Sequence, residues 1–323
     1  MTSSAPKIGL QRLRELAATY GGLLLVLLVL TGVFGLGSRH FFSPATFQAI
    51  ANQTPDAVII AVGMTLVLIA GEIDLSVGSV LALSSAVLGV CLVRYDLPLS
   101  VAVAACLLAG LTAGLLNGLV VICWKLPSFI VTLGMLEIAR GSAYLVTSSQ
   151  TQYIGERIEG IAAAEALGLS LPFFVALGVV ALGQVALEKT VFGRHLIAVG
   201  TNEEAVRLSG IDPRPVKLVV FMLSGLLSAV AAVIHGSRLA SADPNAGTGY
   251  ELSAIAAVVI GGTSLMGGRG SVVSSFFGVL IISVLGSGLA QIGAQEPTKR
   301  LVTGCVIVAA VILDQIRERR QKG

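Results

Sequence analysis

Charged and aromatic residues are scarce in this 323-residue sequence. Asp, Glu, Lys and Arg make up 12% of the chain and aromatic residues 5%, whereas hydrophobic residues make up 55%. No basic patch is interleaved with aromatic residues, so the sequence predicts no nucleic-acid partner. A soluble chain of this length would form about two domains. The mean hydropathy of +0.91 indicates instead a membrane protein that crosses the lipid many times.

The motifs of several enzyme classes are also missing. No Gly-Lys dipeptide occurs, which excludes the phosphate-binding loop of many nucleotide hydrolases. The histidines, His40, His195 and His235, form no close metal-binding pair, and no GxSxG sequence occurs. The cysteines lie in or beside apolar runs, where they are typical of small hydrophobic side chains. We therefore expect no catalytic residue, metal or cofactor.

Apolar runs recur along the whole chain. A transmembrane helix needs about 20 apolar residues, and we find ten candidates, although several are short and the number can differ by one or two. The runs are Leu16–Leu36, Ile50–Ala70, Leu75–Leu92, Leu99–Ile122, Ser128–Val146, Leu167–Leu187, Leu218–Ile234, Leu252–Met266, Val272–Ile292 and Leu301–Ile316. We expect one all-α transmembrane domain over residues 1–323, a polytopic helix bundle of about ten helices.

Lys and Arg predict the orientation, because cytoplasmic loops carry an excess of both. With ten spans and the N-terminus inside, 14 of the 21 fall in inner segments. We therefore expect both termini and the polar loop Lys189–Lys217 in the cytoplasm. The run Leu16–Leu36 is too long for a signal peptide and is expected to be an uncleaved first span.

Two local patterns predict details of the helices. Ser43 followed by Pro44 predicts the start of a short helix at the membrane surface. Three glycines at four-residue spacing permit close approach between membrane helices. They are Gly110, Gly114 and Gly118. We expect this stripe to pack within the chain, with a dimer seam as the alternative.

The polar loop Lys189–Lys217 contains the signals of a short helix over Thr201–Gly210. Thr201 can act as N-cap, and Glu204 three residues later would complete a capping box. Gly210 can take the left-handed position that ends a helix. A helix this short is marginal alone. It is either an ordinary surface helix of a cytoplasmic loop or a docking element for a soluble partner.

A second polar segment, Gly71–Ser79, interrupts two apolar runs. An acid costs roughly 2.5–3.5 kcal/mol at the centre of a membrane helix, so Glu72 and Asp74 must lie at an interface or line a wet cavity. The segment is either a structural break with a capped restart or a part of the pathway or its gate. The pathway candidates are the polar residues at membrane depth: Glu72, Asp74, Ser76, Asn117, Glu137 and Arg140. The last two are three residues apart and can pair on one helix face.

Three segments together resemble the permease subunits of ribose-type ABC sugar importers, in the branched-chain amino acid/ribose permease superfamily. They are GEIDLSVGS at Gly71–Ser79, FGRHLIAVGTNEEAVRLSGI at Phe192–Ile211 and ELSAIAAVVIGGTSLMGGRGS at Glu251–Ser271. The family commonly has GGIDLSVGS in the first segment, so Glu72 departs from it. The similarity extends over nearly the whole chain, in the same order and spacing.

The resemblance implies a ten-span permease of the inner membrane that pairs with a second permease subunit and performs no chemistry. It also implies a cytoplasmic ATPase beneath the permease and a periplasmic sugar-binding protein that delivers a carbohydrate or sugar-like signal molecule. In this family the loop that matches Phe192–Ile211 carries the coupling helix. The residues for which the resemblance implies contact with the ATPase are Arg194, Thr201, Asn202, Glu203, Glu204, Ala205, Arg207 and Gly210.

The third segment is rich in glycine, which tolerates positive φ and close approach of backbones. We expect tight turns or close helix contacts at Gly261, Gly262, Gly267, Gly268 and Gly270. Two other functions stay open from the residues alone. One is an ion-coupled secondary transporter that uses Glu72 and Asp74, and the other is an integral membrane enzyme.

Overall fold

The computed structural model describes residues 7–38, 40–295, 297–306, 308–309 and 312, which are mostly helical. The helices are α1 (Lys7–Gly37), α2 (Pro44–Gln53), α3 (Pro55–Ile69), α4 (Val77–Val93), α5 (Leu99–Trp124), α6 (Ser128–Thr147), α7 (Gly155–Ala163), α8 (Leu171–Lys189), α9 (Val191–Thr201), α10 (Glu203–Leu208), α11 (Arg214–Leu239), α12 (Tyr250–Ile260) and α13 (Val272–Gln291). Four two-residue strands form two antiparallel pairs, β1 (Gln152–Tyr153) with β4 (Ser241–Ala242) and β2 (Glu165–Ala166) with β3 (Leu169–Ser170). The predicted all-α class is confirmed.

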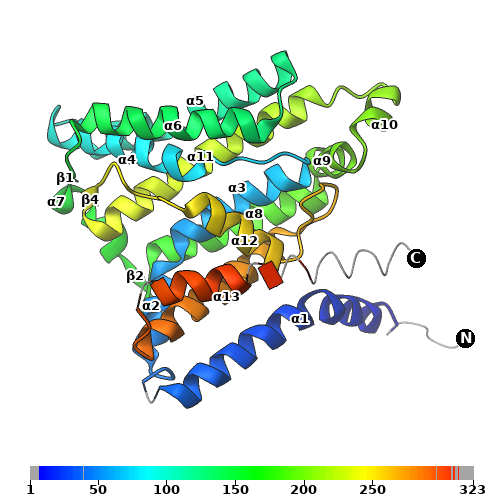
Figure 1. The fold of residues 1–323 in the computed structure, drawn as a ribbon, viewed down its shortest axis with the longest axis horizontal. Helices are drawn as coiled ribbons and strands as arrows, with labels where there is room; N and C mark the ends of the chain where they lie inside the picture. The colour runs from blue at the N-terminus through cyan, green and yellow to red at the C-terminus, as the bar shows by residue number, and fades with distance from the viewer. Residues whose placement is uncertain (1–6, 39, 296, 307, 310–311, 313–323) are drawn as a thin grey trace, which may run out of the picture.

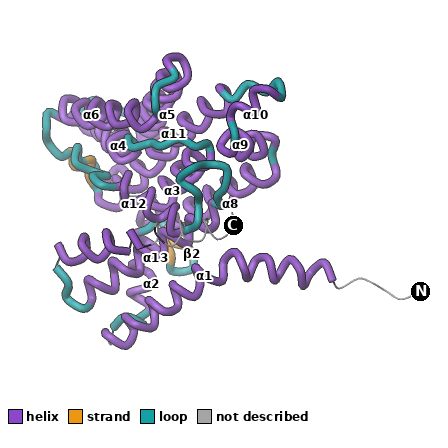
Figure 2. Tube along the Cα trace, turned by 45° about the vertical axis from the view of Figure 1, so that its right-hand side comes forward, coloured by secondary structure: helices purple, strands orange, loops and turns teal. Residues whose placement is uncertain are grey.

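The long helices run between two ends of the molecule (Figure 1). The first, here called the α10 end, carries α9 and α10. The opposite end, here called the α2 end, carries α2, α7 and both strand pairs. Helix α1 lies on the outside of the bundle beside α13 (Figure 2).

Six helices among the described residues are long and apolar enough to cross a membrane, and the α2–α3 pair, bent by 46°, can form a seventh span. The six are Tyr20–Gly37 of α1 and the helices α5, α6, α8, α11 and α13. They coincide with six of the ten predicted runs. Helices α4 and α12 have only 17 and 11 residues, which is short for a span. The run Leu301–Ile316 lies only partly within the described residues. A count of about ten spans is therefore not confirmed.

Helix α3 forms the centre of the bundle. All of its residues except Ala57 are buried, and it packs against α8, α9, α11, α12 and α13. A helix that is apolar on every side is typical of a position surrounded by other helices. Pro55 at its first turn cannot continue the hydrogen bonds of α2 and forces the bend. As predicted, α2 itself begins after Ser43, whose hydroxyl accepts from the Thr46 amide at 3.3 Å.

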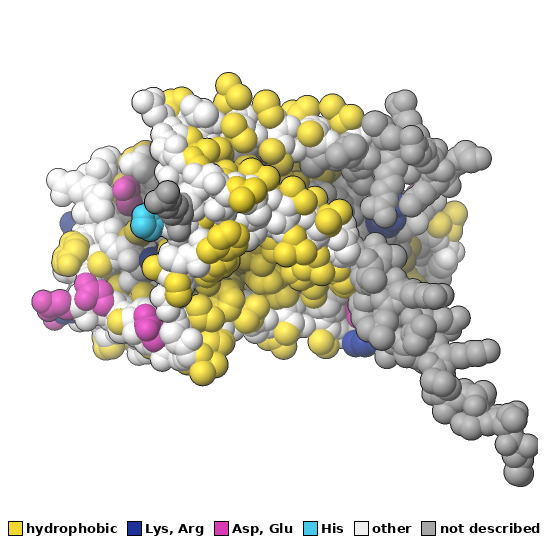
Figure 3. Space-filling view, turned by 90° about the horizontal axis from the view of Figure 1, so that it is seen from below, with side chains coloured by type: hydrophobic (Ala, Val, Ile, Leu, Met, Phe, Trp, Pro, Cys, Tyr) yellow, Lys and Arg dark blue, Asp and Glu magenta, His cyan; other side chains and the backbone are white. Residues whose placement is uncertain are grey.

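The peripheral helices turn apolar side chains outward. Leu108 of α5, Ile138 of α6 and Leu182 of α8 are 61%, 62% and 72% exposed. Figure 3 shows a broad hydrophobic area across the middle of one face, with acidic side chains gathered toward one end. A soluble monomer rarely exposes so large an apolar area. Such a surface is suited to contact with lipid.

The glycine stripe of α5 packs within the chain, as predicted. A Cβ at Gly110 would overlap the carbonyl oxygen of Gly225, and one at Gly114 would overlap that of Phe221, both in α11. Conversely, a Cβ at Gly225 would overlap the Gly110 carbonyl. The two helices therefore approach backbone to backbone, which only small residues permit.

Candidate functional site

Asn202 is the N-cap of helix α10, and its side-chain oxygen accepts from the Ala205 amide at 2.9 Å. The prediction that Thr201 caps this helix is wrong. Thr201 is the last residue of α9, and its hydroxyl donates to the Ile197 carbonyl one turn earlier at 2.7 Å. Asn is as good an N-cap as Thr, so the capping position moves by one residue. Glu204 consequently pairs with Arg207 at 2.6 Å instead of completing a capping box.

The end of α10 follows the predicted glycine geometry. Gly210 has φ +83°. Its amide donates to the Arg207 carbonyl at 3.0 Å, and the Ile211 amide donates to the Val206 carbonyl at 3.3 Å. These two bonds form a Schellman motif, which satisfies the last carbonyls of a helix. The polar loop therefore holds a short helix with hydrogen-bonded caps at both ends.

One side of α10 packs against the protein, while the other is bare. Val206 is 8% exposed, whereas Leu208 is 79% exposed and Ala205 is also exposed. All eight residues predicted to contact a partner are exposed at the α10 end. Apolar side chains therefore remain uncovered on a helix that also presents charges.

Three segments that are far apart in the sequence meet beside α9 and α10. The Gly268 amide donates to the Ile69 carbonyl at the end of α3 at 2.9 Å. A Cβ at Gly200 in α9 would overlap that same carbonyl, and one at Gly267 would come within 3.0 Å of Gly71 and of the Gly200 oxygen. We call these residues the glycine junction: Gly71, Gly200, Gly267 and Gly268. Each of the three motif segments contributes to it, and a side chain at Gly200, Gly267 or Gly268 would collide with backbone or neighbouring atoms.

The other glycines of the third segment serve the turn between α12 and α13. Gly262 has φ +86°, with no atom within 4 Å of its added Cβ. A Cβ at Gly261 would crowd the Ser274 backbone in α13, and one at Gly270 would crowd the side chains of Ile69 and Thr263. This is the geometry of a tight turn with close helix contacts.

Asp74 lies at the centre of a buried polar network and is 1% exposed. One carboxylate oxygen accepts from the Ser76 amide and hydroxyl at 2.9 and 2.6 Å, and the other accepts from the Ser224 hydroxyl of α11 at 2.7 Å. Asn117 of α5 donates to the Ser76 hydroxyl at 3.0 Å. The network ties the break before α4 to two neighbouring helices, and charge-assisted hydrogen bonds satisfy the acid.

Glu72 is satisfied by a different partner. The Lys217 ammonium, at the start of α11, lies 2.6 Å from a carboxylate oxygen of Glu72 and 2.6 Å from one of Glu203. The side chains of Lys217 and Glu72 are 15% and 10% exposed, and that of Glu203 is 50% exposed. Lys217 therefore joins the break to the first residue of α10. The sequence analysis counted Lys217 only as an inner charge and missed this contact.

Glu137 and Arg140 do not form the expected pair. Arg140 donates to the carbonyl oxygens of Pro244 and Ala246 at 2.6 and 2.8 Å. Glu137 is exposed in the middle of α6. Arg140 thus attaches α6 to the loop before α12, and Glu137 points away from the bundle.

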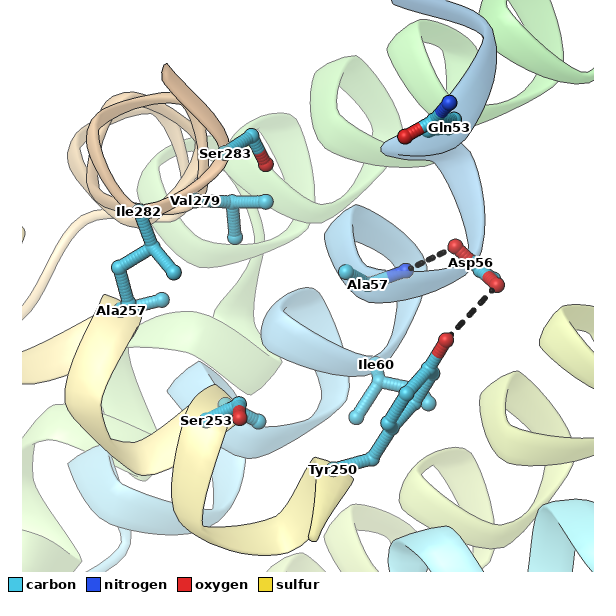
Figure 4. Close-up of a pocket in the computed structure, with 11 residues that line it drawn as sticks. Gln53, Asp56, Ala57, Ile60, Tyr250, Ser253, Ala257, Val279, Ile282 and Ser283 are labelled. Carbon is cyan, nitrogen blue, oxygen red and sulfur yellow. Dashed lines mark hydrogen bonds between the residues drawn. The ribbon is translucent and has the colours of Figure 1, made fainter. Parts of the chain in front are cut away.

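A second charged cluster, which the sequence analysis missed, lies at the α2 end. Asp56 is 1% exposed, and one of its oxygens lies 2.7 Å from His235 Nδ1, 2.8 Å from Arg238 Nη2 and 3.2 Å from the Tyr250 hydroxyl. The cluster joins α3, α11 and α12. Asp56 and Tyr250 also line a cavity of about 130 Å³ whose other side is formed by α13 (Figure 4). Two features of the sequence could have revealed this cluster. One is an acid in the first turn of an apolar helix, and the other is a His and an Arg three residues apart.

Among the residues that the structure describes, no group of three or more His, Cys, Asp or Glu side chains could hold a metal ion. The arrangement is a set of apolar spans around buried polar anchors, with an exposed capped helix at one end. These features define a polytopic membrane domain with an exposed, capped helix at one end.

The chain belongs to the family described as "Branched-chain amino acid transport system / permease component", whose profile matches residues 46–311. It is 40% identical over 301 residues to the ribose import permease protein of Escherichia coli (strain K12), covering 91% of this chain and 93% of that protein. It is 34% identical to the L-arabinose ABC transporter permease protein of Azospirillum brasilense, with 93% and 89% covered. It is 36% identical to the fructose import permease protein of Rhizobium meliloti, with 90% and 84% covered.

No solved structure matches the chain. Family membership and the six apolar helices identify a multi-pass protein of the inner membrane. Members of this family are transport permease subunits, which agrees with the absence of enzyme motifs in the sequence.

The glycine junction predicts different effects for two glycines of positive φ. Replacing either Gly268 or Gly262 by Ala costs about 1 kcal/mol of backbone strain. Only at Gly268 does the new Cβ also collide with Thr201, which adds about 1–3 kcal/mol of overpacking. We expect Gly268→Ala to lower the thermal unfolding midpoint in detergent more than Gly262→Ala does. Equal shifts would contradict the close contact.

Proposed function

We propose that the chain is the permease subunit of an ABC importer for a carbohydrate, either a pentose or hexose or a sugar-like signal molecule. It forms the translocation pathway and couples to a separate ATPase. The exposed, capped helix α10 carries the proposal, because a transporter that works alone has no evident use for it. The relatives named above support the substrate class, since their names specify ribose, L-arabinose and fructose.

The partners follow from the two ends of the molecule. We propose that the ATPase binds at the α10 end, where Ala205 and Leu208 are uncovered. A periplasmic sugar-binding protein would deliver substrate at the α2 end. ATP-driven closure of the ATPases would move α10, and the attached glycine junction would pass this movement to α3 and the break before α4.

A second permease subunit is proposed from the surface of α6. A carboxylate exposed at mid-span costs roughly 2.5–3.5 kcal/mol in lipid, and Glu137 is such a residue. We propose that this side of α6 faces the pathway or the second subunit rather than lipid. The other pathway candidates, Glu72, Asp74, Ser76, Asn117 and Arg140, would support the pathway from within.

The ion-coupled alternative requires acids that bind and release an ion. Glu72 is paired with Lys217, and Asp74 accepts three hydrogen bonds from Ser76 and Ser224. Both acids already have protein partners. The structure therefore favours the ATP-coupled proposal, in which this chain supplies the pathway and no chemistry.

The orientation is proposed from the excess of Lys and Arg in the inner segments. Both termini and α10 would be cytoplasmic, and the loop around Asp243 would be periplasmic. A reporter active only in the periplasm should be silent when fused after Gly210 and active when fused near Asp243. The opposite pattern would overturn the orientation.

The docking role of α10 predicts the effect of one new charge. Replacing Ala205 by Asp places an unpaired charge in the contact, at a cost of about 3–5 kcal/mol, or at least about a hundredfold in affinity. The ATPase copurified in mild detergent and sugar uptake in cells should both fall, while the amount of permease in the membrane stays normal.

The matched control is Ala166→Asp, an exposed alanine of β2 at the α2 end. This variant should bind the ATPase as the unmodified chain does. Normal copurification and uptake with Ala205→Asp would show that α10 is an ordinary surface helix.

A further inference from the structure

Lys217 connects two parts of the chain that the proposed function assigns different tasks. Its ammonium bridges Glu72, in the break between α3 and α4, and Glu203, the first residue of α10. Both distances are 2.6 Å, within the range of charge-assisted hydrogen bonds. The side chain of Lys217 therefore joins α10 to the break between α3 and α4.

The two carboxylates hold Lys217 unequally. Glu72 is 10% exposed and Lys217 15%, so water and salt screen this pair little. Glu203 is 50% exposed and lies on a helix of only six residues. Glu72 is thus the more enclosed partner of Lys217, and Glu203 is the partner that lies on the exposed helix α10.

Glu72 is also linked to the buried polar network through the backbone. It lies two residues before Asp74, whose carboxylate binds Ser76 and Ser224. The Ile73 and Leu75 amides, on either side of Asp74, donate to the hydroxyls of Ser128 and Thr132 in α6, both at 3.0 Å. The short segment has few free backbone groups, so a force on Glu72 reaches α5, α6 and α11.

We propose that Lys217 is a positioning residue that couples the place of α10 to the conformation of the break before α4. This inference rests on the proposed function, in which α10 docks on an ATPase. With Glu203 in place, Lys217 holds α10 and the break together. When the ATPase moves α10, the Glu203 contact is lost and the break is released while Glu72 keeps Lys217.

Glu72 is an acid in the break between two apolar helices, α3 and α4. Such an acid is costly in the membrane, and pairing with Lys217 offsets that cost.

The test measures the coupling of ATP hydrolysis to sugar import separately from the assembly of the permease with its ATPase. The permease would be copurified with its ATPase and reconstituted in liposomes with the binding protein. Radiolabelled ribose, L-arabinose and fructose are the probes, and the ratio of imported sugar to hydrolysed ATP is recorded. Coupling contacts of this kind contribute about two- to thirtyfold.

We expect Glu203→Gln, Glu72→Gln and Lys217→Met to lower the imported sugar per ATP by a factor in that range. Copurification of the ATPase should be unchanged in Glu72→Gln and Lys217→Met, which lie outside the residues expected to contact it. Glu203 is one of those residues, so the ratio for Glu203→Gln is recorded on the copurified complex alone. Lys217→Arg keeps the cation and should retain most of the coupling. The double variant Glu72→Gln with Glu203→Gln should be less impaired than the product of the two single effects, since both act through Lys217.

The matched control is Glu188→Gln, an exposed acid at the end of α8 that accepts from Gln184 at 2.7 Å. It should leave the ratio unchanged. If Lys217→Met fails to fold, the ratio measured for Glu203→Gln tests the role of Lys217 instead, because the half-exposed Glu203 tolerates the change.

A normal ratio in Glu203→Gln and Glu72→Gln, with a normally coupled parent chain, would overturn the role of Lys217 and leave the proposed function intact. A parent chain that neither copurifies with the ATPase nor imports any of the three sugars would overturn the proposed function and this inference with it.

Discussion

The close approach of backbones at the glycine junction is the constraint on which the rest of the structure depends. The end of α3, the end of α9 and the turn after α12 meet without intervening side chains, and the Gly268 amide binds the Ile69 carbonyl. Packed interiors resist continuous deformation. A displacement of α9 must therefore move the central helix or break this contact, which connects the α10 end with the centre of the bundle.

Buried charges specify where the helices cross. Asp74 and Glu72 fix the break near the α10 end, whereas Asp56 with His235 and Arg238 fixes the α2 end. A buried ion pair adds little net stability, but the loss of one partner costs about 3–5 kcal/mol. The acids therefore select one arrangement of apolar helices that would otherwise pack in several registers. This explains why an apolar chain retains acids at positions that lipid cannot accept.

Hydrophobic pattern and local caps predicted much of the fold. The all-α class, six spans, the start of α2 and the packing of the glycine stripe followed from composition and spacing. The number of spans is not confirmed, because α4 and α12 have only 17 and 11 residues, and an apolar run does not reveal how long its helix will be. The N-cap of α10 is Asn202 and not the predicted Thr201, because both residues are suited to this position and only one can occupy it. The Asp56 cluster was missed because its partners lie 179 or more residues away in sequence, and the Lys217–Glu72 pair because its members lie 145 residues apart. Only tertiary contact reveals them.

Direct contact between α10 and an ATPase is the central claim, and Leu208 is the residue best placed to report it, because its side chain is 79% exposed on the bare side of the helix. A cysteine at Leu208, in a chain without its native cysteines, can be treated in membranes with a short bifunctional thiol reagent while the ATPase is present. The account predicts a cross-linked product that contains both subunits and whose amount changes when ATP is added. A Leu208→Cys chain that reacts fully with a small water-soluble thiol reagent in every nucleotide state, and forms no product with the ATPase, would contradict it.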